Sequence, residues 1–483
     1  MLKVLFVAAE AVPFVKTGGL GDVIGSLPKE LKRQGVDVRV MLPNYQDIPE
    51  KYKAQMVFKK DFIVQIGWRQ QYCGVLELEY QGITFYFVDN EYYFKRHGFY
   101  GYGDDGERFS FFCKAVLESL TNIDFMPDVM HCHDWHTGMV SVLLDAEYRQ
   151  LSEYKHLKTM FTIHNLRYQG VFPKDILSNI LSLDWNYFNP DGVEFYETVN
   201  FMKAGLAYSN LISTVSRTYA QEIQYPYFGE KLEGLLSKRQ GDLVGIVNGI
   251  DYEVHNPAMD TKICSNYDVD SLPNKTKNKL QLQEQLGLTV KAEIPMIAIV
   301  SRLVGPKGMD LIENIIVDMF KYMSSENYEV QLVVLGTGEA RYENFFKYMA
   351  WAYPGKVSAN IMFDDTLAHQ IYAGADLFLM PSLYEPCGIG QLIAMRYGCL
   401  PIVRETGGLR DTVQAYNQHR STGNGFSFAN YNAHEMSDTI IRALSIFNNK
   451  EEWNKIVQSA MNSDYSWENS AKQYQELYEK MIG

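Results

Sequence analysis

The segment KTGGLGD, residues 16–22, decides the fold because it joins an apolar run to a helical pattern. Residues 2–9 predict a buried strand. The residues after the segment place apolar side chains on one side of a predicted helix: Val23, Ile24, Leu27, Leu31 and Val36. Glycine at such a crossover lets the backbone approach a ligand, and the first N–H groups of a helix lack partners. With Lys16 these features favour a phosphate or diphosphate site, although a tight turn beside a solvated lysine fits the same residues. The segment follows neither the GxGxxG pattern nor the P-loop pattern.

Length, charge and cysteine content narrow the class of protein. A chain of 483 residues is too long for one core and predicts two domains. Its 45 basic and 58 acidic residues give a net charge of −13, which argues against a nucleic-acid or an anionic-membrane surface. The six cysteines form no CxxC pair, which favours a reduced intracellular protein over a disulfide scaffold. The chain begins with the first predicted strand, without a charged leader or a membrane-spanning apolar run, so we expect a cytoplasmic protein.

Strand and helix patterns alternate through the first half of the chain, which predicts a doubly wound parallel sheet. The predicted strands are residues 36–42, 128–131, 158–163 and 211–215. A hairpin or meander is expected at 62–67, 72–79 and 83–88, and a helix at 107–120. Ligands of such sheets bind beyond the carboxyl ends of the strands, where Lys16, residues 131–134 and His164 fall.

A second α/β block follows a polar segment, residues 260–291, in which Lys275, Lys277 and Lys279 lie close together. Its predicted strands are residues 294–300, 330–335, 375–380 and 399–403, with a helix at 308–323. We therefore expect two Rossmann-like domains, residues 1–245 and 246–461. The helical pattern of the last stretch, about 462–483, is expected to pack back on the first domain.

Two cationic side chains of the second block stand at a predicted strand end and a helix start, namely Arg302 and Lys307. Both could be solvated surface groups. Lys16 offers the same chemistry from the first domain, however, and cations that face each other across an interdomain cleft suit a diphosphate.

A carboxylate motif, Glu385-Pro386-Cys387-Gly388, follows the strand predicted at 375–380. A carboxylate there can accept hydrogen bonds from sugar hydroxyls, and the N–H groups of residues 388–390 could meet phosphate. The other interpretation is an acid at a helix entry, where the helix dipole favours negative charge.

The histidines of residues 131–136, HCHDWH, invite a metal interpretation that the sequence does not favour. His131, His133 and His136 span a strand, a loop and a helix, so their rings need not converge on one ion. Asp134, a possible helix N-cap, and Trp135 are better suited to carbohydrate, with the indole as a stacking surface. His164 and Asn165 close a strand and point to the same region, although His164 could equally cap the next turn.

The chain resembles the family of bacterial glycogen synthase and plant starch synthase. Seven motifs carry the resemblance, in order along essentially the whole chain: residues 16–22, 131–136, 162–165 (TIHN), 247–251 (VNGID), 301–303 with 307–308 (SRL and KG), 385–388 and 406–409 (TGGL). The resemblance implies the GT-B fold, an α/β fold with two Rossmann-like, doubly wound domains facing each other across a deep cleft. It implies an N-terminal acceptor side and a C-terminal donor side. It also implies transfer of glucose from ADP-glucose to the 4-OH at the non-reducing end of an α-1,4-glucan such as glycogen, with retention and release of ADP. We expect no cofactor and no metal.

The resemblance also implies roles for single residues. Catalytic roles fall to His164, Arg302, Lys307 and Glu385. Donor contacts fall to Lys16, Gly18, Gly19, Asp22, Asn248, Phe363, Cys387, Gly388, Ile389, Gly390, Thr406, Gly407 and Gly408. The acceptor side is implied for Asp134, Trp135 and Asn165. Two positions depart from the family pattern, since Gly390 stands where a threonine is expected and Phe363 where a base-stacking tyrosine is expected.

Other functions fit the same fold. One is a non-catalytic protein that binds glucan or senses a nucleotide sugar, and another is a glucosyltransferase that uses UDP-glucose. A phosphorylase with pyridoxal phosphate is disfavoured. Retention could arise by same-face attack or through a covalent carboxylate intermediate, and the sequence leaves both routes open.

Overall fold

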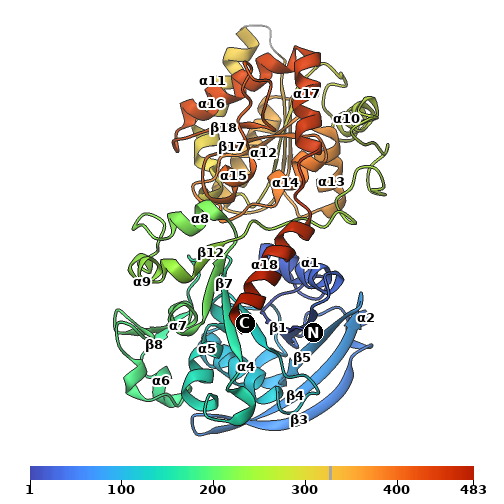
Figure 1. The fold of residues 1–483 in the computed structure, drawn as a ribbon. Helices are drawn as coiled ribbons and strands as arrows, with labels where there is room; N and C mark the ends of the chain where they lie inside the picture. The colour runs from blue at the N-terminus through green and yellow to red at the C-terminus, as the bar shows by residue number, and fades with distance from the viewer. Residues whose placement is uncertain (326–328) are drawn as a thin grey trace. The chain divides into compact units, whose positions relative to one another are not determined.

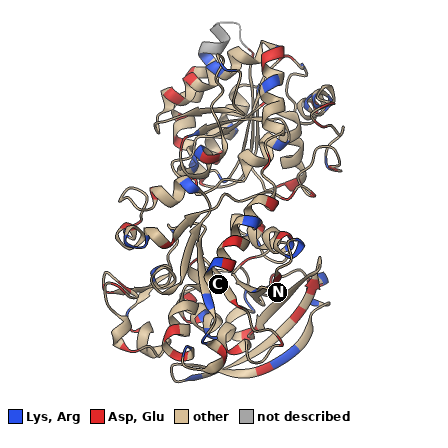
Figure 2. Ribbon diagram, in the orientation of Figure 1, with Lys and Arg blue, Asp and Glu red and all other residues tan. Residues whose placement is uncertain are grey.

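The computed structural model describes residues 1–325 and 329–483 (Figure 1). The chain forms two compact units. The first consists of Met1–Asn248 together with Trp467–Gly483, and the second of Gly249–Ser466. No helix in the described residues is long and apolar enough to cross a membrane. Acidic and basic residues are interspersed over both units (Figure 2).

A nine-stranded sheet with the order β12-β11-β7-β6-β1-β2-β5-β4-β3 forms the centre of the first unit. Its strands are β1 (Lys3–Val7), β2 (Asp37–Pro43), β3 (Val57–Ile66), β4 (Arg69–Tyr80), β5 (Ile83–Asp89), β6 (Val129–His133), β7 (Lys158–Ile163), β11 (Leu211–Thr214) and β12 (Leu243–Gly245). All neighbours pair in parallel except β3 with β4 and β4 with β5. The predicted meander is therefore confirmed, and it extends a doubly wound sheet at one edge.

The central strand shows why this sheet forms. The side chains from Val4 to Val7 are fully buried, so β1 has a continuous apolar run rather than alternation. Such a run is typical of a parallel strand that is covered on both faces. The helices of this unit are α1 (Gly19–Arg33), α2 (Glu50–Lys53), α3 (Glu91–Phe94), α4 (Asp105–Ser119), α5 (Met139–Leu143), α6 (Ile176–Asn179), α7 (Phe201–Tyr208), α8 (Arg217–Glu222), α9 (Glu233–Lys238) and α18 (Trp467–Ile482). A small antiparallel sheet adds β8 (Val171–Pro173), β9 (Glu194–Phe195) and β10 (Thr198–Asn200).

The last helix, α18, packs beside α1 in the first unit (Figure 1). It buries Trp467, Ala471, Tyr474 and Tyr478 at helical spacing, which gives it one apolar face. The Tyr478 hydroxyl lies 2.7 Å from His131 Nδ1, in the middle of the sheet. This contact joins the end of the chain to the strand that carries the histidine motif.

A six-stranded parallel sheet with the order β15-β14-β13-β16-β17-β18 forms the second unit. Its strands are β13 (Met296–Val300), β14 (Gln331–Leu335), β15 (Val357–Asn360), β16 (Leu377–Met380), β17 (Leu400–Arg404) and β18 (Phe426–Phe428). Its helices are α10 (Pro273–Gln285), α11 (Met309–Ser325), α12 (Ala340–Ala352), α13 (Asp365–Gly374), α14 (Gly390–Arg396), α15 (Gly407–Thr412), α16 (Ala433–Phe447) and α17 (Lys450–Met461). Every connection between two successive strands of this sheet contains at least one helix, as parallel pairing requires a crossover.

Several expectations are corrected by the structure. Helix α1 ends at Arg33, so Val36 lies outside it and leads into β2. The polar segment 260–291, in which no helix was predicted, contains α10, and Lys279 on that helix is buried. The short strands β12, β15 and β18 and the small sheet β8–β10 had not been predicted.

Candidate active site

Lys307 and Glu385 form an ion pair at the carboxyl edge of the second sheet. Lys307 follows β13 and Glu385 follows β16, and these two strands are hydrogen-bonded neighbours. Lys307 Nζ lies 2.6 Å from Glu385 Oε2, and the Ser382 hydroxyl donates to the same oxygen at 2.9 Å. The Glu385 side chain is 8% exposed and that of Lys307 is 23% exposed. A cation and a carboxylate that sequence analysis assigned separately are thus held as one unit.

The two loops that carry this pair touch each other closely. The Leu383 N–H donates to the Pro306 carbonyl at 2.9 Å. Gly308 has a φ of +80°, and a Cβ there would lie 2.2 Å from the Pro381 carbonyl oxygen. Only glycine fits this position, because any side chain would push the two loops apart.

The TGGL segment packs against the backbone of residues 381–389, the loop between β16 and α14 that carries Glu385 and is called the glutamate loop below. The Gly408 N–H lies 3.1 Å from the Glu385 carbonyl oxygen. A Cβ on Gly407 would lie 2.0 Å from that same oxygen, and a Cβ on Gly408 would lie 2.1 Å from the Cys387 carbonyl oxygen. The glycines therefore position the glutamate loop through backbone contact, with Thr406 buried at the start of α15.

The remaining donor-side candidates of the second unit lie along the same sheet edge. Arg302 is exposed just after β13, and Phe363 is 87% exposed just after β15. Residues 387–390 lead from the glutamate loop into α14, and Gly388 has a φ of +76°. Gln391 holds this turn, since its amide donates to the Cys387 and Gly388 carbonyls at 3.1 and 3.0 Å.

In the first unit, Glu10 holds the glycine-rich loop, and sequence analysis did not single it out. Glu10 is only 3% exposed and accepts hydrogen bonds from the Thr17 N–H at 2.6 Å and the Gly18 N–H at 3.3 Å. The hydroxyls of Thr17 and Tyr100 also donate to it. The Gly18 N–H, expected to face phosphate, thus points at a carboxylate in this structure.

Lys16 is half-exposed and pairs with Asp22, one turn into α1. Its Nζ lies 2.7 Å from Asp22 Oδ1, and the two side chains are 47% and 34% exposed. Two residues that the motif assigned to the donor are therefore in direct contact. Asn248 lies at the end of the first unit's main segment, and its buried Oδ1 has no hydrogen-bond partner among the described residues.

Asp134, His164 and Asn165 meet at the carboxyl ends of β6 and β7. Asp134 Oδ1 accepts from the His164 N–H at 2.8 Å and from the Asn165 N–H at 3.4 Å. Asp134 occupies the N-cap position of the 3-10 turn Trp135–Thr137 with a φ of 58°, but its carboxylate does not cap that turn. It bridges two strands instead, which corrects the N-cap prediction.

Burial sets the protonation of these groups. Burial raises the pKa of Asp134 to about 7. The hydrogen bonds from the His164 and Asn165 N–H groups oppose this rise but do not cancel it. It lowers the pKa of His164 to about 3, so this ring is neutral near pH 7. His164 Nε2 lies 3.0 Å from His133 Nδ1, so the two rings share a hydrogen bond.

The prediction that Trp135 offers a stacking surface is wrong. The residue is 9% exposed, and its ring stacks on His136 with centroids 4.0 Å apart. Phe109 covers the indole edge-on at 5.1 Å, and a Cβ on Gly170 would lie 2.2 Å from the indole. The ring fills the core and has no face open to a sugar.

The three histidines of the motif do not converge on a metal site. His131 Nε2 bonds the Thr162 hydroxyl at 2.5 Å while its Nδ1 faces Tyr478. His136 packs on Trp135, and its pKa is lowered to about 3 by burial. No group of three or more metal-ligating side chains occurs in the part of the chain that the structure describes.

Comparison with known proteins gives this arrangement a class. The family profile described as "Starch synthase catalytic domain" matches residues 3–238, and "Glycosyl transferases group 1" matches residues 286–460. With two Rossmann-like units, these matches define the protein as a glycosyltransferase.

Full-length relatives narrow the class to a family. Proteins named glycogen synthase are 53% identical in Desulforamulus reducens and 55% in Geobacillus stearothermophilus, covering 100% of this chain and 99% and 98% of their own lengths. The catalytic domain of starch synthase IV from Arabidopsis thaliana, solved bound to ADP and acarbose, matches with a TM-score of 0.91 and 33% identity over 100% of this chain and 99% of that chain. The chain belongs to the bacterial glycogen synthase and starch synthase family. The predicted two-domain α/β fold of that family is confirmed.

Proposed function

We propose that the protein transfers glucose from ADP-glucose to the 4-OH at the non-reducing end of an α-1,4-glucan, retaining the anomeric configuration and releasing ADP. The observation that carries the proposal is the Lys307–Glu385 pair, 2.6 Å apart at the carboxyl edge of the second sheet with Arg302 exposed on the same edge. It offers cations for a leaving diphosphate and a carboxylate for sugar hydroxyls. ADP in the starch synthase IV structure supports the choice of nucleotide.

In this proposal the diphosphate is stabilised mainly as its charge develops. Lys307 and Arg302 meet the leaving group, and such preorganised charges act chiefly on the transition state. Lys16 of the first unit would add a further cation for the donor phosphates. Lys16 would exchange Asp22 for phosphate, leaving Asp22 near the donor glucose.

The acceptor side is assigned to the group around Asp134. Neutral His164 would flank the reacting sugar and could offer one ring N–H, with Asn165 beside it. Phe363, 87% exposed, would stack on the nucleotide base without the hydroxyl of a tyrosine. Backbone N–H groups of residues 388–390 and 407–408 complete the proposed donor site. We place the reaction in the cytoplasm, where the six cysteines, none of which forms a disulfide among the described residues, are expected to persist as thiols.

A donor assay with glycogen as the acceptor tests the proposal. We expect ADP to be released from ADP-glucose, with elongation of glycogen, and much lower turnover with UDP-glucose. Binding of ADP-glucose without ADP release would instead identify a sensor. Preference for UDP-glucose would keep the reaction and overturn the choice of donor.

A further inference from the structure

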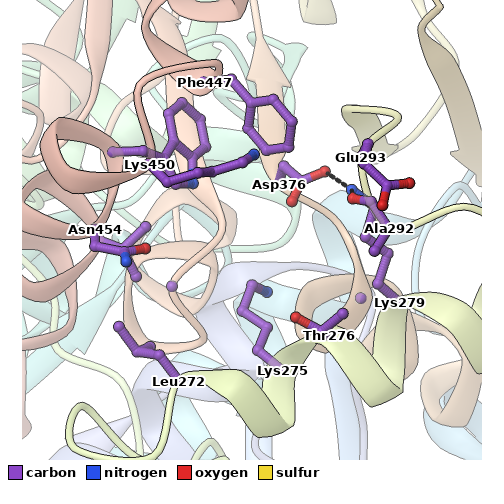
Figure 3. A pocket seen from close by; sticks show the side chains of 14 residues that line it. Leu272, Lys275, Thr276, Lys279, Ala292, Glu293, Asp376, Phe447, Lys450 and Asn454 are labelled. Carbon is purple, nitrogen blue, oxygen red and sulfur yellow. Dashed lines mark hydrogen bonds and ion pairs between the residues drawn. The ribbon is translucent and has the colours of Figure 1, made fainter.

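A cavity lies within the second unit, away from the residues assigned to catalysis. It has a volume of ≈ 290 Å³ and is lined mainly by α10, α16, α17 and the segment before β16 (Figure 3). Asp376, on its wall, directly precedes β16, whereas Glu385 follows that strand. A strand of this length rises about 13 Å. The cavity therefore opens at the amino-terminal edge of the sheet, opposite the candidate active site.

Three lysines line this cavity, and only one of them is neutralised. Lys279 Nζ lies 2.6 Å from Asp376 Oδ2, and this pair is almost completely buried. Lys275 Nζ donates to two backbone carbonyls at the end of α13, those of Tyr372 at 3.1 Å and Ala373 at 2.8 Å. Lys450 Nζ lies 3.2 Å from the centroid of the Phe447 ring. Neither Lys275 nor Lys450 has a carboxylate partner at ion-pair distance within residues 1–325 and 329–483.

The surroundings of these two ammonium groups favour an anion. Burial lowers the pKa of Lys275 to about 8 and also lowers the pKa of Lys450. The charge of Asp376 opposes both effects, and the charge of Lys279 adds to them. Glu293, exposed on the wall, is the other carboxylate that lines the cavity besides the paired Asp376. An anion that entered between the lysines would supply the missing countercharge.

The walls add an apolar component to this charge. Phe447 and Trp453 line the cavity, and both are largely buried. Figure 3 shows Lys275 and Lys279 rising from α10 on one side and Lys450 reaching in from the other, below the Phe447 ring. A volume of ≈ 290 Å³ exceeds that of a single water by about tenfold, so the cavity has room for a group larger than a lone ion.

We propose that this cavity binds a small organic phosphate, with the phosphate between Lys275 and Lys450 and the organic part against Phe447 and Trp453. Lysine binds phosphate as a point charge and needs no planar geometry. The site is independent of the proposed glucosyl transfer, because none of its residues is assigned to donor or acceptor.

Calorimetric titration of the full chain with phenyl phosphate and with inorganic phosphate tests the proposal. We expect phenyl phosphate to bind more tightly, since only the ester can use the aromatic walls. Lys450→Met should weaken phenyl phosphate binding at least about tenfold, the scale of one lost charged hydrogen bond. Asn454→Glu, which adds a negative charge at an exposed lining position, should weaken it similarly. Both positions are exposed on α17, so both variants are expected to keep the native melting temperature.

Two matched variants locate the binding. Lys277→Met removes an exposed lysine of α10 that does not line the cavity, and it should leave the affinity unchanged. Lys307→Ala alters the candidate active site and should also leave cavity binding unchanged. Binding that survives Lys450→Met but disappears in Lys307→Ala would assign the phosphate to the active site and overturn the proposal, as would an absence of binding to the unaltered protein. Equal affinity for the two phosphates would refute the role of the aromatic walls.

Discussion

Single side chains carry the proposed chemistry, and substitution of Lys307 tests it most directly. Its ammonium group is fixed 2.6 Å from Glu385, so its position is preorganised before any ligand arrives. Lys307→Ala should lower kcat about 10²- to 10³-fold, the scale for losing one group that stabilises developing charge. Steady-state kinetics with ADP-glucose and glycogen measure the loss. Lys291→Ala, which removes an exposed lysine of the same unit, should retain full turnover. A loss confined to KM would show that Lys307 binds the ground state and transition state equally.

Asp134 gives a prediction for pH. Its pKa in the folded protein is raised to about 7 by burial, above that of an unfolded chain, so the native state holds an extra proton between about pH 4 and 7. The free energy of unfolding should therefore fall as pH rises through this window. Asp134→Asn keeps an oxygen for the His164 and Asn165 N–H groups but cannot ionise, so it should remove that part of the fall. Urea unfolding of both proteins at about pH 5.5 and about pH 8 measures the difference. Parallel pH profiles would contradict this role of Asp134.

At the scale of elements, the approach of α15 to the glutamate loop can be tested through one glycine. Gly408→Ala would place a Cβ 2.1 Å from the Cys387 carbonyl oxygen, so the loop must shift. We expect the unfolding free energy to fall by about 1–3 kcal/mol. Turnover should fall as well, because the displaced loop carries Glu385. Gly234→Ala is the control, because this glycine lies inside α9 with no atom near its Cβ position, and alanine favours helix. Activity equal to that of the unaltered protein in Gly408→Ala would show that the loop tolerates displacement.

The elements also show what the sequence could and could not predict. Strand β7 has the predicted bounds, residues 158–163, because its sequence, KTMFTI, is rich in residues that favour strands and ends at the polar motif His164-Asn165. Strand β15, Val357–Asn360, was missed because its four residues, VSAN, form no apolar run, and alternation over so few residues, two of them alanine and asparagine, is a weak strand signal. The burial of Trp135 depends on Gly170 and on aromatic residues distant in sequence, so no local pattern could reveal it. The role of Glu10 likewise arises only when folding brings Tyr100 to it.

At the scale of the whole molecule, the chain closes its first unit with its last helix. The second unit is one continuous segment, Gly249–Ser466. The first unit also needs Trp467–Gly483, because α18 packs on α1 and its Tyr478 hydroxyl contacts His131 Nδ1. Deleting residues 467–483 removes three buried aromatic side chains, worth at least about 5 kcal/mol together. That loss is comparable to the whole stability of a domain.

We therefore expect the deletion to abolish the cooperative unfolding of the first unit and to leave that of the second unit nearly unchanged. Hydrogen exchange followed peptide by peptide separates the two units, because it reports protection in each strand. Tyr478→Phe is the graded control, since it keeps the helix and removes only the hydroxyl that lies 2.7 Å from His131 Nδ1. It should cost the first unit about 1–2 kcal/mol. Equal loss of protection in β7 and in β16 would mean that the two units unfold together and that α18 supports the whole chain.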